Sequence, residues 1–217
     1  MIPSLNRSVL LLICLFFCFA YGLYSQEVIT GLYTNTSIQN TTKQLVSKSS
    51  KSQMLTLPFI DDFSGKGIFP EDSLWANKNV FINSSYPYLP VTIGVATFDA
   101  LNDTGALYPD ASSYGFIADS LTSKPFRLDS VFGANPGPLT IGDSIYFSFY
   151  YQPQGVGNAP EAEDSLVLEF YSPLSGEWKH IWASPGFTLA QFHSQYNVWF
   201  RQVMIPMLVF DETVKIG

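Results

Sequence analysis

Apolar and polar side chains alternate along two runs in the second half of the chain. The apolar positions of the first run are Ile145, Phe147, Phe149 and Tyr151, and those of the second run are residues 166, 168 and 170. A period of two is typical of a β-strand that packs one face on a core, and neither run fits a helix. The alternation therefore predicts two strands.

A turn and a third strand follow the second run. Residues 172–176 read Ser-Pro-Leu-Ser-Gly, in which proline presets φ and glycine accepts a positive φ. The strand pattern then resumes, and a period of two places Trp178, His180 and Trp182 on one face. The sequence therefore predicts a β-hairpin with an aromatic face.

Short apolar runs separated by turn residues continue through the rest of the chain, for example at residues 80–82 and 125–128. No window longer than about ten residues keeps a helical period. The pattern predicts an all-β domain over residues 55–217, an antiparallel β-sandwich of the jelly-roll type. We expect a strand over residues 199–210 that stops at Pro206, and, because the chain then ends without the partners such a strand would need, we expect the sandwich to be incomplete at its C-terminus.

Two segments precede this domain. Residues 1–25 carry a single charge, a short apolar run and then small residues, which is the pattern of a secretory signal peptide, a retained anchor being the alternative. Residues 26–54 are rich in Thr, Ser, Asn, Gln and Lys, and we expect a loosely ordered leader or an edge strand there. Both cysteines, Cys14 and Cys18, lie in the signal segment, so a secreted or cell-surface chain would have no disulfide.

The formal net charge of −7 narrows the partners of such a chain. It argues against nucleic acid and, after signal cleavage, against an anionic membrane. Acidic surfaces suit cations and neutral ligands such as sugars. Besides the export machinery, we therefore expect polysaccharide or surface glycans as partners.

Several segments together resemble a known family. These segments are residues 57–63 (Leu-Pro-Phe-Ile-Asp-Asp-Phe), 92–99, 118–125, 146–153 and 164–170. They are similar to the MAM-like and concanavalin-like jelly-roll domains of proteins that gliding and related bacteria secrete, commonly by the type IX route. The resemblance implies a jelly roll and type IX export, although the cysteines of animal MAM domains and the C-terminal sorting domain of type IX cargo are absent here.

A second resemblance concerns Asp-Ser followed by an aliphatic residue. This tripeptide is similar to the O-glycosylation acceptor of the same bacterial group, in which the serine hydroxyl carries the sugar. The acceptors would be Ser73, Ser120, Ser130, Ser144 and Ser165. The alternative is that Asp and Ser end turns by bonding nearby backbone, and that the aliphatic residue begins a strand.

The sequence predicts no catalytic residue and no enzyme. Glycoside hydrolysis needs two carboxyl groups facing one cleft, and the nearest candidates, Glu161 and Glu163, lie in a turn bordered by Pro and Gly. The two histidines, His180 and His193, are the only bases near neutral pH, and no Ser or Cys stands in a nucleophile-elbow pattern. A solvated acidic loop is the simpler interpretation of the glutamates.

Calcium is the one metal that the sequence suggests. Asp61 and Asp62 open the domain, and the resemblance implies a structural calcium near that strand. Asp99 and Asp164 are the candidates to complete the ligand set. The alternative is that Asp61 and Asp62 cap a turn.

Aromatic side chains provide the candidate ligand-binding residues. Trp178, Trp182 and Tyr150 would stack on sugar rings, with Gln152 as a polar partner, and packing in a core is the alternative for each. The sequence thus predicts a non-catalytic exported β-sandwich module of a larger protein, acting in adhesion or display. The alternative is a carbohydrate-binding module that targets an attached enzyme to polysaccharide.

Overall fold

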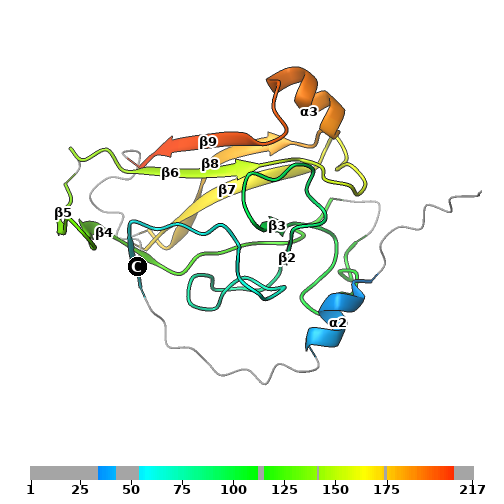
Figure 1. Ribbon diagram of the computed structural model, residues 1–217, viewed down its shortest axis with the longest axis horizontal. Helices are drawn as coiled ribbons and strands as arrows, with labels where there is room; N and C mark the ends of the chain where they lie inside the picture. The colour runs from blue at the N-terminus through cyan, green and yellow to red at the C-terminus, as the bar shows by residue number, and fades with distance from the viewer. Residues whose placement is uncertain (1–33, 43–53, 112–114, 141, 174, 208–217) are drawn as a thin grey trace, which may run out of the picture. The chain divides into compact units, whose positions relative to one another are not determined.

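The computed structural model describes residues 34–42, 54–111, 115–140, 142–173 and 175–207 (Figure 1). The predicted signal peptide, most of the leader and the chain after residue 207 lie outside these residues. Strands dominate the described residues, so the fold is predominantly β. Neither helix in this part of the chain has the length and hydropathy that a membrane-spanning helix requires.

Nine strands and two helices make up the described structure. In chain order they are α2 (Thr36–Thr42), β1 (Leu55–Leu57), β2 (Phe81–Asn83), β3 (Val95–Thr97), β4 (Phe126–Val131), β5 (Gly137–Pro138), β6 (Tyr146–Tyr151), β7 (Ser165–Ser172), β8 (Glu177–Pro185), α3 (Leu189–Tyr196) and β9 (Arg201–Pro206).

The strands form four small sheets within the described residues, with the orders β1-β4-β5, β2-β3, β6-β9 and β7-β8. Three sheets are purely antiparallel, but β1 pairs with β4 in parallel, which corrects the expectation of an antiparallel fold throughout. These sheets are short and do not close on one another. The structure thus supports an all-β class and no finer jelly-roll or sandwich assignment.

The main core lies between the β6-β9 ribbon and the β7-β8 ribbon (Figure 1). The alternation predicted for β6 is confirmed, because Phe147, Phe149 and Tyr151 face inward and residues 146, 148 and 150 face solvent. Phe147 meets Phe170 of β7 edge to face, with the ring centroids 5.5 Å apart. Inward-facing aromatic rings of the two ribbons therefore supply much of the packing.

The β7-β8 hairpin has the predicted turn. Gly176 has a φ of 71° and donates its N–H to the carbonyl of Ser172 at 2.8 Å. The expectation that Trp178, His180 and Trp182 share a face is wrong, however. A β-bulge leaves Ile181 unpaired, so His180 lies opposite Glu169 while Trp182 lies opposite Leu168. One extra residue reverses the faces, because side chains alternate with a period of two.

Helix α3 connects β8 to β9 and was not predicted, because its eight residues are too few for a recognisable helical period. It begins with a capping box, in which the hydroxyl of Thr188 accepts the N–H of Gln191 and the Gln191 side chain accepts the N–H of Thr188. It ends at Asn197, whose left-handed φ is 55°. Phe192, fully buried, anchors the helix to the core of the two ribbons.

The described part of the predicted leader contains a helix, α2, instead of an edge strand. Asn35 begins it, since its side-chain oxygen accepts the N–H groups of Ser37 and Ile38. Ile38 is buried, and Thr34 forms a bridge with Ala106. This segment therefore packs on the domain that follows it.

Candidate functional site

The outward face of the β7-β8 hairpin carries an exposed aromatic pair, Tyr171 and Trp178. The two side chains lie opposite each other in the register, with ring centroids 5.3 Å apart and ring planes at 56°. Tyr171 is 40% exposed and Trp178 is 53% exposed. Glu169 and His180 form the next pair on the same face, and both are exposed.

The structure separates the four residues that the sequence proposed for sugar binding. Trp178 and Tyr150 face solvent, but on different ribbons. Trp182 faces the core, where its ring meets Phe149 edge to face at 5.3 Å. Gln152 hydrogen-bonds the backbone of Tyr88 and Trp199. The four residues therefore do not form one platform, and Tyr171 replaces Trp182 as the partner of Trp178.

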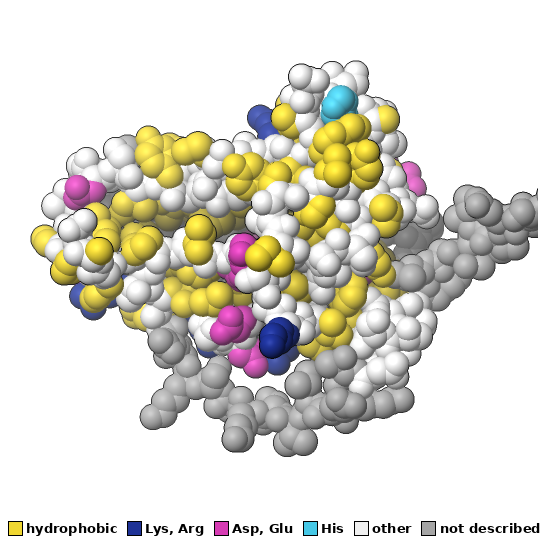
Figure 2. Space-filling model, in the orientation of Figure 1, with side chains coloured by type: hydrophobic (Ala, Val, Ile, Leu, Met, Phe, Trp, Pro, Cys, Tyr) yellow, Lys and Arg dark blue, Asp and Glu magenta, His cyan; other side chains and the backbone are white. Residues whose placement is uncertain are grey.

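The β6-β9 ribbon has its own exposed apolar face. Tyr146, Tyr150 and Met204 are about half exposed on it, at 54%, 49% and 58%. On the side of the molecule seen in Figure 2, hydrophobic side chains are widespread and charged side chains are few. Sequence reasoning assigned Tyr150 to the same site as Trp178, because it could not tell which strands pair.

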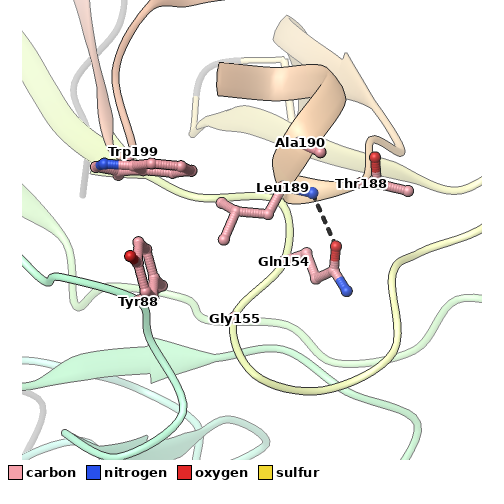
Figure 3. A pocket seen from close by; sticks show the side chains of 7 residues that line it. All are labelled: Tyr88, Gln154, Gly155, Thr188, Leu189, Ala190 and Trp199. Carbon is pink, nitrogen blue, oxygen red and sulfur yellow. Dashed lines mark hydrogen bonds between the residues drawn. The ribbon is translucent and has the colours of Figure 1, made fainter. Parts of the chain in front are cut away.

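A cavity of about 600 Å³ lies between four segments, from three separate regions of the sequence (Figure 3). Tyr88 comes from the loop after β2, Gln154 from the loop after β6, Leu189 from the start of α3, and Trp199 from the segment before β9. Figure 3 shows Tyr88 and Leu189 on the same side of the Trp199 ring, with the cavity between them. No sequence pattern joined these residues.

Gln152 holds two walls of this cavity in place. Its amide nitrogen donates to the carbonyl oxygens of Tyr88 and Trp199, each at 2.9 Å, and its amide oxygen accepts the N–H of Tyr88 at 2.8 Å. The Tyr88 and Trp199 rings meet edge to face at 4.9 Å. His193 stacks on Trp199 at 3.9 Å. The walls are therefore fixed before any ligand arrives.

A second cavity, of about 480 Å³, adjoins the turn that contains Glu161. Asp164 accepts the N–H of Glu161 at 2.8 Å, so this carboxylate caps the turn. Of the described residues that line the cavity, Glu161 alone carries a carboxylate, and Glu163 is outside it. A glycosidase pair needs two facing carboxyl groups, and this cavity has one.

Asp61 and Asp62 each accept the backbone N–H of the residue two positions later. Asp61 accepts the N–H of Phe63 at 2.8 Å with one oxygen and the indole N–H of Trp75 at 2.6 Å with the other. Hydrogen bonds from the Ser64 side chain and from the Ser64 N–H lower the pKa of Asp62. Within the described residues no three His, Cys, Asp or Glu side chains form a metal-binding group. These contacts favour turn capping, and calcium stays a prediction.

Asp99, a candidate calcium ligand, lies in contact with Asp119, and sequence reasoning did not foresee this contact. Asp119 accepts the N–H of Asp99 and the hydroxyl of Tyr108, both at 2.8 Å. Burial raises the pKa of Asp119 to about 7 and also raises the pKa of Asp99, one oxygen of which is buried without a partner. Burial, with the charge of Asp119, raises the pKa of Tyr108. The pair lines neither cavity described above.

The predicted glycosylation serines differ in accessibility. Ser73, Ser144 and Ser165 are exposed, whereas Ser120 and Ser130 are half-buried. The Ser120 hydroxyl also accepts a hydrogen bond from the side-chain amide of Asn77 at 3.0 Å. Accessibility therefore favours Ser73, Ser144 and Ser165 as acceptors, and glycosylation stays a prediction.

No protein-family model, curated protein or solved structure matches the chain. The resemblance to MAM-like and concanavalin-like domains therefore stays a prediction.

Proposed function

We propose that the chain is a non-catalytic module of an exported protein that binds polysaccharide through the outward face of the β7-β8 hairpin. Its role would be adhesion or display at a cell surface. The observation that carries the proposal is the exposed pair of Tyr171 and Trp178, whose rings lie opposite each other, tilted at 56°, on the same face of the hairpin.

Sugar binding is the chemistry that this pair supports best. The apolar face of a pyranose ring packs on an aromatic ring, while its hydroxyl groups need hydrogen-bonding partners nearby. Glu169 and His180 occupy the adjacent register position on the same face and supply such partners. Strands hold aromatic side chains more firmly than loops do, which limits the entropy lost when a ligand binds.

Retention on insoluble polysaccharides tests this proposal. The full chain would be mixed with cellulose, chitin, xylan and mannan, and the free protein measured after sedimentation. We expect the chain to be retained on at least one polysaccharide. We expect Trp178→Ala and Tyr171→Ala each to weaken the affinity for that polysaccharide about tenfold, because each substitution removes one of the two aromatic rings.

Met204→Ala is the matched control, since Met204 is 58% exposed on the other ribbon and lies outside the platform. Retention that is equal in the wild type and in both aromatic variants would contradict the proposal, as would the absence of retention on every polysaccharide.

A further inference from the structure

The cavity between Tyr88, Trp199 and Leu189 is a prepared site. Gln152 bonds the backbone of both aromatic walls, and Gln154 accepts the N–H of Leu189 at 2.8 Å and donates to the carbonyl of Gly157 at 2.8 Å. Two side chains from one loop thus position three walls of the cavity. Because the walls are held by the protein itself, a ligand would not have to order them.

The loop that carries these glutamines is seated against the segment of Tyr88. Val156 donates its N–H to the carbonyl of Tyr86 at 2.8 Å. A Cβ on Gly155 would lie 2.0 Å from the same carbonyl oxygen, so only glycine permits this approach. The cavity therefore depends on a close backbone contact between segments about seventy residues apart.

The lining selects for an uncharged ligand. No Asp, Glu, Lys or Arg is among the described residues that line the cavity, so a charged group entering it would lose water without gaining an opposite charge. Most of the lining is aromatic or aliphatic. A ligand with an apolar face therefore fits this surface.

Two polar groups on the walls are available to such a ligand. Neither the hydroxyl of Tyr88 nor the indole N–H of Trp199 has a hydrogen-bond partner among the residues that the structure describes. His193 stacks on the indole of Trp199, Tyr88 meets the same indole edge to face, and Tyr88 and Leu189 lie on one side of the ring (Figure 3). A pyranose combines an apolar ring face with hydroxyl groups in one neutral molecule, and it therefore suits this lining.

We propose that this cavity binds the neutral terminal pyranose of a glycan, as a second site in addition to the Tyr171–Trp178 platform. This inference rests on the proposed glycan-binding function and names the part of the glycan that the cavity takes. Its volume of about 600 Å³ is within the range of small-molecule sites. Tyr88 is 42% exposed, so the rest of a glycan can extend into solvent.

Binding of neutral monosaccharides to the full chain tests the proposal. The probes are the methyl glycosides of glucose, galactose, mannose and xylose, measured by calorimetry and by chemical-shift changes of the indole N–H signals. We expect at least one glycoside to bind and to shift the Trp199 signal. We expect Trp199→Leu to weaken this binding about tenfold or more, because the stacking face is lost.

Leu189→Trp is a second variant, in case Trp199→Leu does not fold. It fills the cavity from the helix side without removing a wall, and we expect it to abolish glycoside binding. Val198→Ala is the control, because Val198 is exposed beside Trp199 and does not line the cavity. Its affinity should equal that of the wild type.

The absence of a shift at Trp199 with every glycoside would overturn the proposal, and so would unchanged affinity in Leu189→Trp. Retention on insoluble polysaccharide through Tyr171 and Trp178 is measured separately. If no glycoside binds in the cavity, the retention measured on polysaccharide is unaffected. If the chain is not retained on any polysaccharide, the glycoside measurement still tests the cavity.

Discussion

Single polar side chains have roles here that their sequence neighbours do not reveal. Gln152 serves two backbone segments at once, and Asp61 joins the turn at Phe63 to the indole of Trp75. A buried or half-buried polar group loses its hydrogen bonds to water when the chain folds. Each hydrogen bond within the protein offsets that loss, whereas a group left unpaired lowers the stability of the fold. For Asp119 this contribution to stability depends on pH, because the pKa of its carboxyl group is raised to about 7.

The raised pKa of Asp119 predicts a pH-dependent stability. An unfolded Asp titrates near its ordinary value of 3.8, whereas the folded chain holds this proton up to about pH 7. Between these two pH values the folded state thus binds more protons than the unfolded state does. The stability that Asp119 contributes is therefore lost as the pH rises from about 4 to about 7. We expect Asp119→Asn to reduce this loss, measured as the difference in Tm between about pH 5 and about pH 7.5.

The control for this prediction is Asp72→Asn, because Asp72 forms an exposed ion pair with Lys78 at 3.0 Å. Exposed ion pairs contribute little to stability, so the difference in Tm should match that of the wild type. A wild-type chain that is equally stable at both pH values would contradict the assignment to Asp119.

At the scale of elements, helix α3 links the cavity to the core. Leu189 lines the cavity at the start of the helix, and Phe192 is buried one turn later among the aromatic residues of both ribbons. Most of the stability of so short a helix comes from packing and caps and not from propensity. Its first turn is therefore a sensitive place to change.

Thr188→Ala removes the capping hydroxyl of α3. The N–H of Gln191 then loses its partner, and we expect the free energy of unfolding in urea to fall by about 1 kcal/mol. Thr188→Ser keeps the hydroxyl and should stay within about half that value of the wild type. Equal losses in the two variants would show that the methyl group, and not the cap, is what matters.

The β7-β8 hairpin shows how an element can be predicted correctly and still be misread. Its strands and turn follow from alternation and from Ser172–Gly176, both local properties of the chain. The bulge at Ile181 depends on the register of the two strands, which the spacing of Trp178 and Trp182 does not express. Trp178 and Trp182 are four residues apart, a spacing that places both on one face of a regular strand, but they lie on opposite faces in the structure.

At the scale of the whole described domain, close backbone contacts join segments that are far apart in the chain. Gly155 approaches Tyr86, and Gly186 approaches Glu161 equally closely, since a Cβ on either glycine would meet a carbonyl oxygen at 2.0 Å. These contacts bring the loops around α3 together. Both cavities lie beside these contacts, since Gly155 lines the first cavity and Gly186 lines the second.

Gly155→Ala should separate the loop after β6 from the segment of Tyr86. Backbone must move to admit the methyl group, and we expect the free energy of unfolding to fall by about 1–3 kcal/mol. Gly157→Ala is the matched control in the same loop, where a Cβ meets nothing within 4 Å. A chain equally stable with alanine at either position would contradict the close contact.

The sequence by itself determined the predominantly β class, the strands around the main core and the turn of the hairpin, because alternation and turn chemistry act over a few residues. Only the tertiary structure decided which strands pair, which tryptophan faces solvent, and that Tyr88, Gln152 and Trp199 meet at one cavity. Those facts depend on register and on contacts between distant segments, and a one-dimensional pattern carries neither.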